Sequence, residues 1–153
     1  MRIMTFNCNG VRSAAKKGFF DWLPGQNVDV VCLQETKAQL HQLKDSIFHP
    51  VDYEVCYFEA QKKGYAGTAL FSKLEPTKVT KGLGFDISDT EGRFIQADFK
   101  DFSVASMYLP SGSSGEERQA RKLRFMGEFM KFMQGLKSKR REFIICADWN
   151  ICH

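Results

Sequence analysis

The stretch Glu142-Phe143-Ile144-Ile145-Cys146-Ala147-Asp148-Trp149-Asn150 contains five consecutive apolar residues followed by an aspartate and an asparagine. The apolar run, residues 143–147, predicts a strand that is buried on both faces of a sheet. Ligands of α/β proteins usually bind just beyond the carboxyl ends of such strands. We therefore expect Asp148 and Asn150 to lie at a functional edge of the sheet.

Two earlier stretches have the same form, an apolar strand that ends in polar side chains. Residues 3–6 are followed by Asn7, and residues 28–33 are followed by Gln34 and Glu35. From this spacing alone, Glu35 and Asp148 could be oxygen ligands of Mg²⁺ or Mn²⁺, or acids that only cap a following element. Asn7 could be an ordinary turn residue. Whether these groups act together depends on whether the three strand ends meet in space.

The other predicted elements follow from hydrophobic periodicity and turn signals. Helices are expected over residues 13–23, 38–47 and 114–136, the last with a capping-box pattern at Ser114 and Glu117. Strands are expected over residues 2–8, 28–34, 53–58, 68–72, 78–80, 93–99 and 103–108. This order predicts a mixed α/β fold with a long antiparallel section.

Composition indicates one globular domain with a substantial core: the chain has 153 residues, 43% hydrophobic and 26% charged. No apolar run is long enough to cross a membrane and the N-terminus has no signal-peptide pattern, so no membrane partner is expected. The five cysteines are odd in number and form no C-x-x-C pair, which favours reduced thiols and a cytoplasmic location. The formal net charge of +4 is compatible with a polyanionic partner but does not require one.

Six short motifs run in order from one end of the chain to the other. They are FNCNGVR at 6–12, LQETK at 33–37, KGYAGTA at 63–69, EGRFI at 91–95, YLPSG at 108–112 and ADWNI at 147–151. In this order and spacing they closely resemble the exonuclease III family of apurinic/apyrimidinic (AP) DNA endonucleases. That family lies within the endonuclease/exonuclease/phosphatase superfamily.

The resemblance implies a fold, a four-layered α/β sandwich of the DNase I-like type. Family members are considerably longer than this chain, so residues 1–153 are expected to be the N-terminal part, roughly the first half, of a single domain. The second half is expected to supply the other sheet of the sandwich. In its absence, the inner face of the sheet would be an exposed apolar surface prone to association.

The resemblance also implies a function, Mg²⁺-dependent (or Mn²⁺-dependent) hydrolysis of phosphodiesters at abasic sites and 3′ ends of duplex DNA. The implied metal-binding residues are Glu35 and Asn7. The implied catalytic residues are Tyr108, which would hydrogen-bond the scissile phosphate, Asp148, which would orient or activate the attacking water, and Asn150. The implied DNA-binding residues are Arg12, Lys37, Gly64, Tyr65 and Arg93.

The chain departs from the family at its end. Relatives place a catalytic histidine in a late Ser-Asp-His motif, which is absent here, and His153 stands in a different position. The isolated chain is therefore expected to have little or no nuclease activity, and its partner would be the missing C-terminal half or a second copy.

Two other functions remain open from the sequence. A superfamily phosphatase acting on phosphoinositides or sphingolipids would share Asn7, Glu35 and Asp148 with Asn150. The motifs around Tyr65, Arg93 and Tyr108 favour DNA. A truncated, non-catalytic DNA-binding module is the other possibility.

Overall fold

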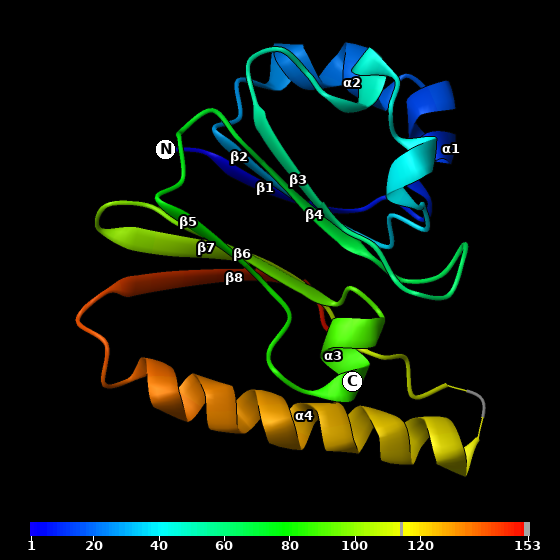
Figure 1. Ribbon diagram of the computed structural model, residues 1–153, viewed down its shortest axis with the longest axis vertical. Helices are drawn as coiled ribbons and strands as arrows, with labels where there is room; N and C mark the ends of the chain where they lie inside the picture. The colour runs from blue at the N-terminus through cyan, green and yellow to red at the C-terminus, as the bar shows by residue number, and fades with distance from the viewer. Residues whose placement is uncertain (114, 152–153) are drawn as a thin grey trace.

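The computed structural model describes residues 1–113 and 115–151, which form two four-stranded sheets packed face to face (Figure 1). The first sheet has the order β1 (Ile3–Asn7), β2 (Val30–Gln34), β4 (Thr68–Ser72), β3 (Glu54–Phe58). The second has the order β5 (Lys78–Lys81), β6 (Phe94–Asp98), β7 (Phe102–Tyr108), β8 (Glu142–Asp148). The predicted strands are thus confirmed to within a few residues at their ends.

Helices cover the outer faces of both sheets, which completes four layers (Figure 1). Over the first sheet lie α1 (Val11–Lys16), α2 (Phe19–Trp22) and three 3₁₀ turns (Leu23–Gln26, Leu40–Gln42 and Ser46–Phe48). The long helix α4 (Glu116–Leu136) runs along the second sheet, and the short α3 (Asp86–Thr90) lies beside it. The predicted four-layered α/β sandwich is therefore confirmed.

Two of the three predicted helices differ from the structure. The helix expected over residues 13–23 is broken at Gly18, whose φ of +84° ends α1 before α2 begins. The helix expected over residues 38–47 is wrong: the segment forms two 3₁₀ turns. Its apolar residues do not share one buried face, because Leu43 is buried while Leu40 and Ile47 are exposed. Helix α3 was not predicted, and the proposed cap at Ser114 lies outside the described residues.

Three apolar layers hold the sandwich together. The first, which includes Phe20, Leu23 and Phe71, lies between the first sheet and its helices, the second lies between the sheets, and the third packs α4 on the second sheet. The middle layer contains Val30, Cys32, Leu70, Ile95, Ala97, Phe99 and Val104. The expectation that the missing half supplies the other sheet is wrong, because this chain contains both sheets and their inner faces cover each other.

Both sheets end on the same side of the sandwich. Among the described residues β1 pairs only with β2 and β8 pairs only with β7, so each is the last strand of its sheet. The prediction that residues 143–147 are buried on both faces is wrong, since no residue of β8 is fully buried. β2, which has neighbours on both sides, is buried along its whole length. The two edge strands lie on the same side of the molecule, because Asn7 of β1 contacts Asp148 of β8.

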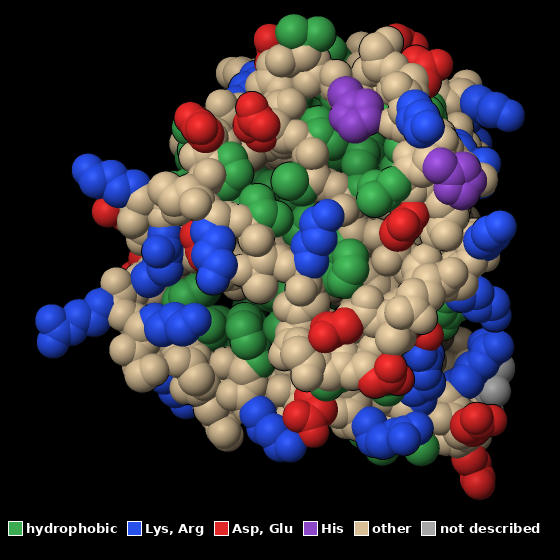
Figure 2. Space-filling view, in the orientation of Figure 1, with side chains coloured by type: hydrophobic (Ala, Val, Ile, Leu, Met, Phe, Trp, Pro, Cys, Tyr) green, Lys and Arg blue, Asp and Glu red, His purple; other side chains and the backbone are tan. Residues whose placement is uncertain are grey.

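The described residues show where the cysteines and the charged side chains lie. Within the described residues, no helix is long and apolar enough to cross a membrane. Cys8, Cys32, Cys56 and Cys146 are free thiols, and Cys152 lies outside the described part of the chain. Figure 2 shows Lys and Arg side chains spread over the visible face, with apolar side chains between them. The positive charge is therefore dispersed on this face.

Gly92 fixes a close approach between two loops near the strand ends. Its φ is +58°, and a Cβ at this position would lie 2.4 Å from the carbonyl oxygen of Phe58 and 2.7 Å from that of Glu59. Gly64 has a similar φ of +70°, but a Cβ there would meet no atom within 4 Å. Of these two positions, Gly92 alone requires glycine for packing as well as for backbone conformation.

Replacing Gly92 by alanine is expected to destabilise the chain more than the same replacement at Gly64. Both substitutions place a Cβ on a left-handed backbone, which costs about 1–2 kcal/mol. Gly92→Ala adds overlap with backbone oxygens, for a further ~1–3 kcal/mol. Urea unfolding followed by circular dichroism measures both losses in the free energy of unfolding. Equal losses would contradict the described packing of this loop against β3.

Candidate active site

Two pairs of parallel strands bring the predicted polar residues to one end of the sandwich. β1 runs parallel to β2, with Asn7 opposite Gln34, and β7 runs parallel to β8, with Tyr108 opposite Asp148. Parallel strands end at the same edge of their sheet, so each pair presents its polar residues together. The two ends face each other across the middle of the sandwich. The strand ends that the sequence singled out therefore do converge.

Asn7 connects the acids of the two sheets. Its Nδ2 donates to Oε1 of Glu35 at 2.9 Å and to Oδ2 of Asp148 at 2.7 Å. Its Oδ1 accepts a hydrogen bond from the backbone N–H of Asn9 at 3.0 Å. In this orientation Asn7 acts as a donor between two carboxylates, and its own oxygen is engaged by the loop after β1.

Glu35 is held in place by its neighbours and is ionised at neutral pH. Lys37 forms an ion pair with Oε2 of Glu35 at 2.6 Å and also donates to Oδ1 of Asn9 at 2.5 Å. Burial by itself raises the pKa of Glu35, but Lys37, Asn7 and Tyr108 together outweigh it, so the pKa of this carboxyl lies below its ordinary value. The site therefore carries a fixed negative charge with a lysine beside it.

Tyr108 has two charged neighbours, the Glu35 carboxylate of the first sheet and the buried Arg93. Burial raises the pKa of its phenol above the ordinary value, and the neighbouring Glu35 carboxylate raises it further. The hydroxyl therefore keeps its proton near neutral pH and can donate it in a hydrogen bond. The guanidinium carbon of Arg93 lies 4.8 Å from the centroid of the Tyr108 ring.

Asp148 is oriented from both of its oxygens. Oδ2 accepts from Asn7, and Oδ1 accepts from the backbone N–H of Asn150 at 3.0 Å. Asn150 is itself tied down, because its Nδ2 donates to the carbonyl of Leu109 at 2.8 Å and its carbonyl accepts from Lys122 of α4 at 2.6 Å. The loop after β8 is thereby fixed against the loop after β7.

Unfavourable backbone conformations cluster at this end of the sandwich. Six non-glycine residues in the described part of the chain have positive φ, and five of them belong to the loops around the site. These five are Asn9, Glu35, Lys37, Ala66 and Asn150. Such strain persists where surrounding contacts over-determine the backbone, and it is typical of functional sites.

The predicted DNA-binding residues divide into three groups. Arg12, Lys37 and Gly64 line one groove of about 750 Å³ beside α1, and Arg12 and Gly64 are exposed. Tyr65 follows Gly64 in the sequence and is partly buried. Its hydroxyl accepts a hydrogen bond from Arg93. Arg93 is only 2% exposed and its nitrogens bind protein groups, so it has no free face for direct contact with a DNA backbone.

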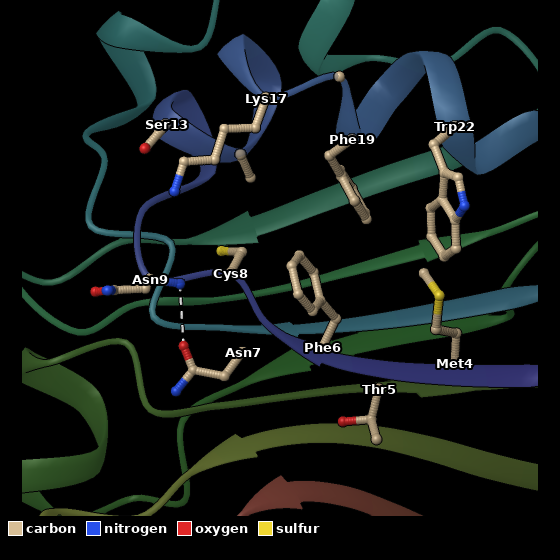
Figure 3. Close-up of a pocket in the computed structure, with 12 residues that line it drawn as sticks. Met4, Thr5, Phe6, Asn7, Cys8, Asn9, Ser13, Lys17, Phe19 and Trp22 are labelled. Carbon is tan, nitrogen blue, oxygen red and sulfur yellow. Dashed lines mark hydrogen bonds between the residues drawn. The ribbon is translucent and has the colours of Figure 1, made fainter.

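A second groove, of about 730 Å³, runs along the open edge of β1 from Asn7 towards α2. Figure 3 shows Phe6, Phe19 and Trp22 along it, with the hydrogen bond between Asn9 and Asn7 at its polar end. The rings of Phe6 and Phe19 stack with centroids 5.2 Å apart, yet Phe6 is 38% and Trp22 51% exposed. This side of the site is therefore bordered by apolar surface.

The residues at the site offer oxygen donors to a divalent cation. Within the described residues, no group of three or more His, Cys, Asp and Glu side chains forms a ready-made metal cage. Mg²⁺ does not need one, because it commonly binds through one or two carboxylates and keeps several waters. Glu35 and Asp148, bridged by one amide, are a donor set that fits such a hard cation.

Sequence reasoning missed four residues that organise this site: Ser106, Glu91, Arg121 and Lys122. Ser106 accepts a hydrogen bond from Gln34 across the middle layer at 3.0 Å, and Glu91 pairs with both Arg93 and Arg121. Lys122 holds the carbonyl of Asn150. Glu91 stands in the EGRFI motif, which is the signal that could have found it. Ser106, Arg121 and Lys122 carry no local signal, because their partners are distant in sequence.

Comparisons with known proteins identify the family of this chain. The model of the endonuclease/exonuclease/phosphatase family matches residues 4–153. The chain is 36% identical over 154 residues to the exodeoxyribonuclease of Bacillus subtilis, covering all of this chain and 60% of that protein. It is 35% identical over 155 residues to the DNA repair nuclease APEX1 of Danio rerio, covering 50% of that protein.

Solved structures show the same similarity. An AP endonuclease from Archaeoglobus fulgidus superposes with a TM-score of 0.85 at 30% identity, over 99% of this chain and 58% of that one. The chain thus spans about half to three-fifths of the relatives that it matches. It belongs to the endonuclease/exonuclease/phosphatase family, and the relatives that it matches are exonuclease III-type and AP endonuclease proteins.

Proposed function

We propose that this chain is the N-terminal part of a metal-dependent DNA-repair nuclease that hydrolyses phosphodiesters of duplex DNA at abasic sites and 3′ ends. The observation that carries the proposal is the Asn7 amide that joins Glu35 and Asp148 beside Tyr108. The names of the relatives, an exodeoxyribonuclease, a DNA repair nuclease and an AP endonuclease, support the same substrate class.

Glu35 is the residue we propose to hold the cation, Mg²⁺ or Mn²⁺, with Asp148 and Asn7 nearby. A bound divalent cation would neutralise charge on the phosphodiester and lower the pKa of a bound water. Glu35 suits this role because it is ionised and its position is fixed by Asn7 and Lys37. Lys37 adds a positive charge at the place where an anionic phosphate would bind.

Tyr108 and Asp148 have complementary tasks in the proposed reaction. Tyr108 keeps its proton and is proposed to donate a hydrogen bond to a phosphate oxygen, where negative charge develops. Asp148, held by Asn7 and Asn150, is proposed to orient the attacking water and accept its proton. Both residues lie at the ends of adjacent parallel strands, so their spacing is set by the sheet.

The groove lined by Arg12, Lys37 and Gly64 is the proposed path of the DNA backbone. Cationic side chains at such a groove position duplex DNA through its phosphates without reading sequence. That mode of contact suits an enzyme that acts at an abasic site, where the base to be read is missing. Tyr65, beside this groove, is proposed to contact the same strand.

Binding of the cation is expected to depend on Glu35. Glu35→Gln removes the charge and keeps the shape, so it should weaken the binding of Mn²⁺ to the 153-residue chain at least ~10-fold. Isothermal titration calorimetry measures the change. The control is Glu54→Gln, which alters an exposed acid on β3 and should bind as the parent chain does. Unchanged affinity in Glu35→Gln would remove Glu35 from the metal role.

We also propose that the chain needs further polypeptide for activity. The relatives extend well beyond the part that it matches, and both β1 and β8 end their sheets on the side next to the site. The histidines among the described residues, His41 and His49, belong to the turns between β2 and β3. His153 lies outside the described residues. We expect the missing C-terminal half, rather than a second copy, to complete the site.

A nicking assay on abasic duplex DNA with Mg²⁺ tests this requirement. The pure chain is expected to show no turnover, whereas a chimera that adds the unmatched part of the Bacillus subtilis exodeoxyribonuclease is expected to nick. Glu35→Gln in the chimera should abolish cleavage while salt-sensitive DNA binding survives. Clear turnover by the chain alone would refute the requirement. Binding without cleavage by every form would identify a DNA-binding module instead.

A further inference from the structure

Arg93 is the largest fully buried side chain among the described residues, and each of its three side-chain nitrogens has a protein partner. Its nitrogens donate to Oε2 of Glu91 at 2.6 Å, to the carbonyl of Tyr108 at 2.9 Å and to the hydroxyl of Tyr65 at 3.1 Å. A guanidinium removed from water is tolerated when it is paired with a carboxylate and hydrogen-bonded to other protein groups. Arg93 is therefore a fixed internal cation at the edge of the candidate active site.

The guanidinium of Arg93 packs against the rings of two tyrosines, Tyr108 and Tyr65. The guanidinium carbon lies 4.8 Å from the ring centroid of Tyr108 and 5.6 Å from that of Tyr65. A flat guanidinium attracts and stacks on aromatic faces, which a lysine ammonium in the same place would do less well. The backbone N–H of Tyr108 also donates to the carbonyl of Arg93 at 2.9 Å. Arg93 therefore contacts Tyr108 twice, through a hydrogen bond to its backbone and through packing against the face of its ring.

Glu91 connects Arg93 to Arg121 of helix α4. Glu91 pairs with Arg93 through one oxygen and with Arg121 of α4 through the other. Arg121 also donates to the hydroxyl of Tyr65 at 3.5 Å. Glu91 is 15% exposed and Arg121 29% exposed, so the pair is largely sheltered from water and salt. The network spans the loop 61–67, the start of β6, the end of β7 and α4.

We infer that Arg93 is a positioning residue: it holds the Tyr108 ring in place beside Glu35, and Arg121 locks Arg93 through Glu91. The same cation supports Tyr65, so the loop next to the proposed DNA groove and the catalytic tyrosine share one support. The catalytic consequence rests on the proposed function, whereas the positioning of the ring does not.

Ring signals of labelled tyrosine test the positioning in the 153-residue chain. The chain has four tyrosines, of which Tyr53 and Tyr57 belong to the first sheet and its helices. Arg121→Met, at a partly exposed position, is expected to shift the ¹³C–¹H ring signals of Tyr65 and Tyr108 and to leave those of Tyr53 and Tyr57 unchanged. The control is Arg124→Met, which alters an exposed residue of the same helix.

The deciding signal is that of Tyr108, because Arg121 is linked to it through Arg93, by way of Glu91 and of the Tyr65 hydroxyl. If Arg121→Met leaves the Tyr108 ring signal as it is in the parent, the inference that Arg121 of α4 helps to fix the Tyr108 ring through Arg93 is overturned. Arg93→Lys tests the central residue directly, and the milder Arg121 variant keeps the test decisive if Arg93→Lys does not fold.

A double-mutant cycle in the chimera tests the catalytic consequence. Arg93→Lys is expected to lower kcat at least ~10-fold, because small displacements of a catalytic group are costly. In the Tyr108→Phe background the same change should cost less than ~3-fold, since the hydroxyl that Arg93 positions is already gone. Fully additive losses would overturn the role through Tyr108. An inactive chimera would count against the proposed function, and the ring signals would still decide the positioning.

Discussion

The side-chain amide of Asn7 joins the two sheets at the point where the chemistry is proposed to occur. It donates to Glu35 in its own sheet and to Asp148 in the facing sheet, which lies 141 positions further along the chain. Two carboxylates that face each other repel, and a shared donor offsets this repulsion. Asn7 therefore links the two acids directly, and the relative position of the sheets determines whether its amide can reach both.

The pairing of the strands explains why Asn7, Tyr108 and Asp148 lie at the same end of the sandwich. β1 with β2 and β7 with β8 are the parallel pairs of the sandwich, and each places its polar ends at the same edge. The loops that follow are bent sharply, with positive φ at Glu35, Lys37 and Asn150. Contacts from Ala66, Gly67 and Leu109 hold these loops, so strain in the backbone is balanced by hydrogen bonds between them.

The side of the sandwich that carries the edge strands β1 and β8 is also the side that carries the candidate active site. β1 and β8 are both half-exposed edge strands, and apolar grooves border each of them. An unpaired strand edge next to apolar surface is a template for pairing with a further segment. The relatives extend beyond the matched region, which is consistent with more polypeptide on this side. The inner faces of the sheets, in contrast, already cover each other.

The sequence by itself determined the strands, the long helix and the polar strand ends, because alternating or continuous apolar runs depend only on neighbouring residues. It also singled out Glu35, Tyr108 and Asp148 through local motifs. Only the tertiary structure decided that both sheets are present, that β8 is an edge strand and that Arg93 is buried behind Tyr108. These features depend on contacts between segments far apart in the chain, such as Glu91 with Arg121, which leave no periodic trace in the sequence.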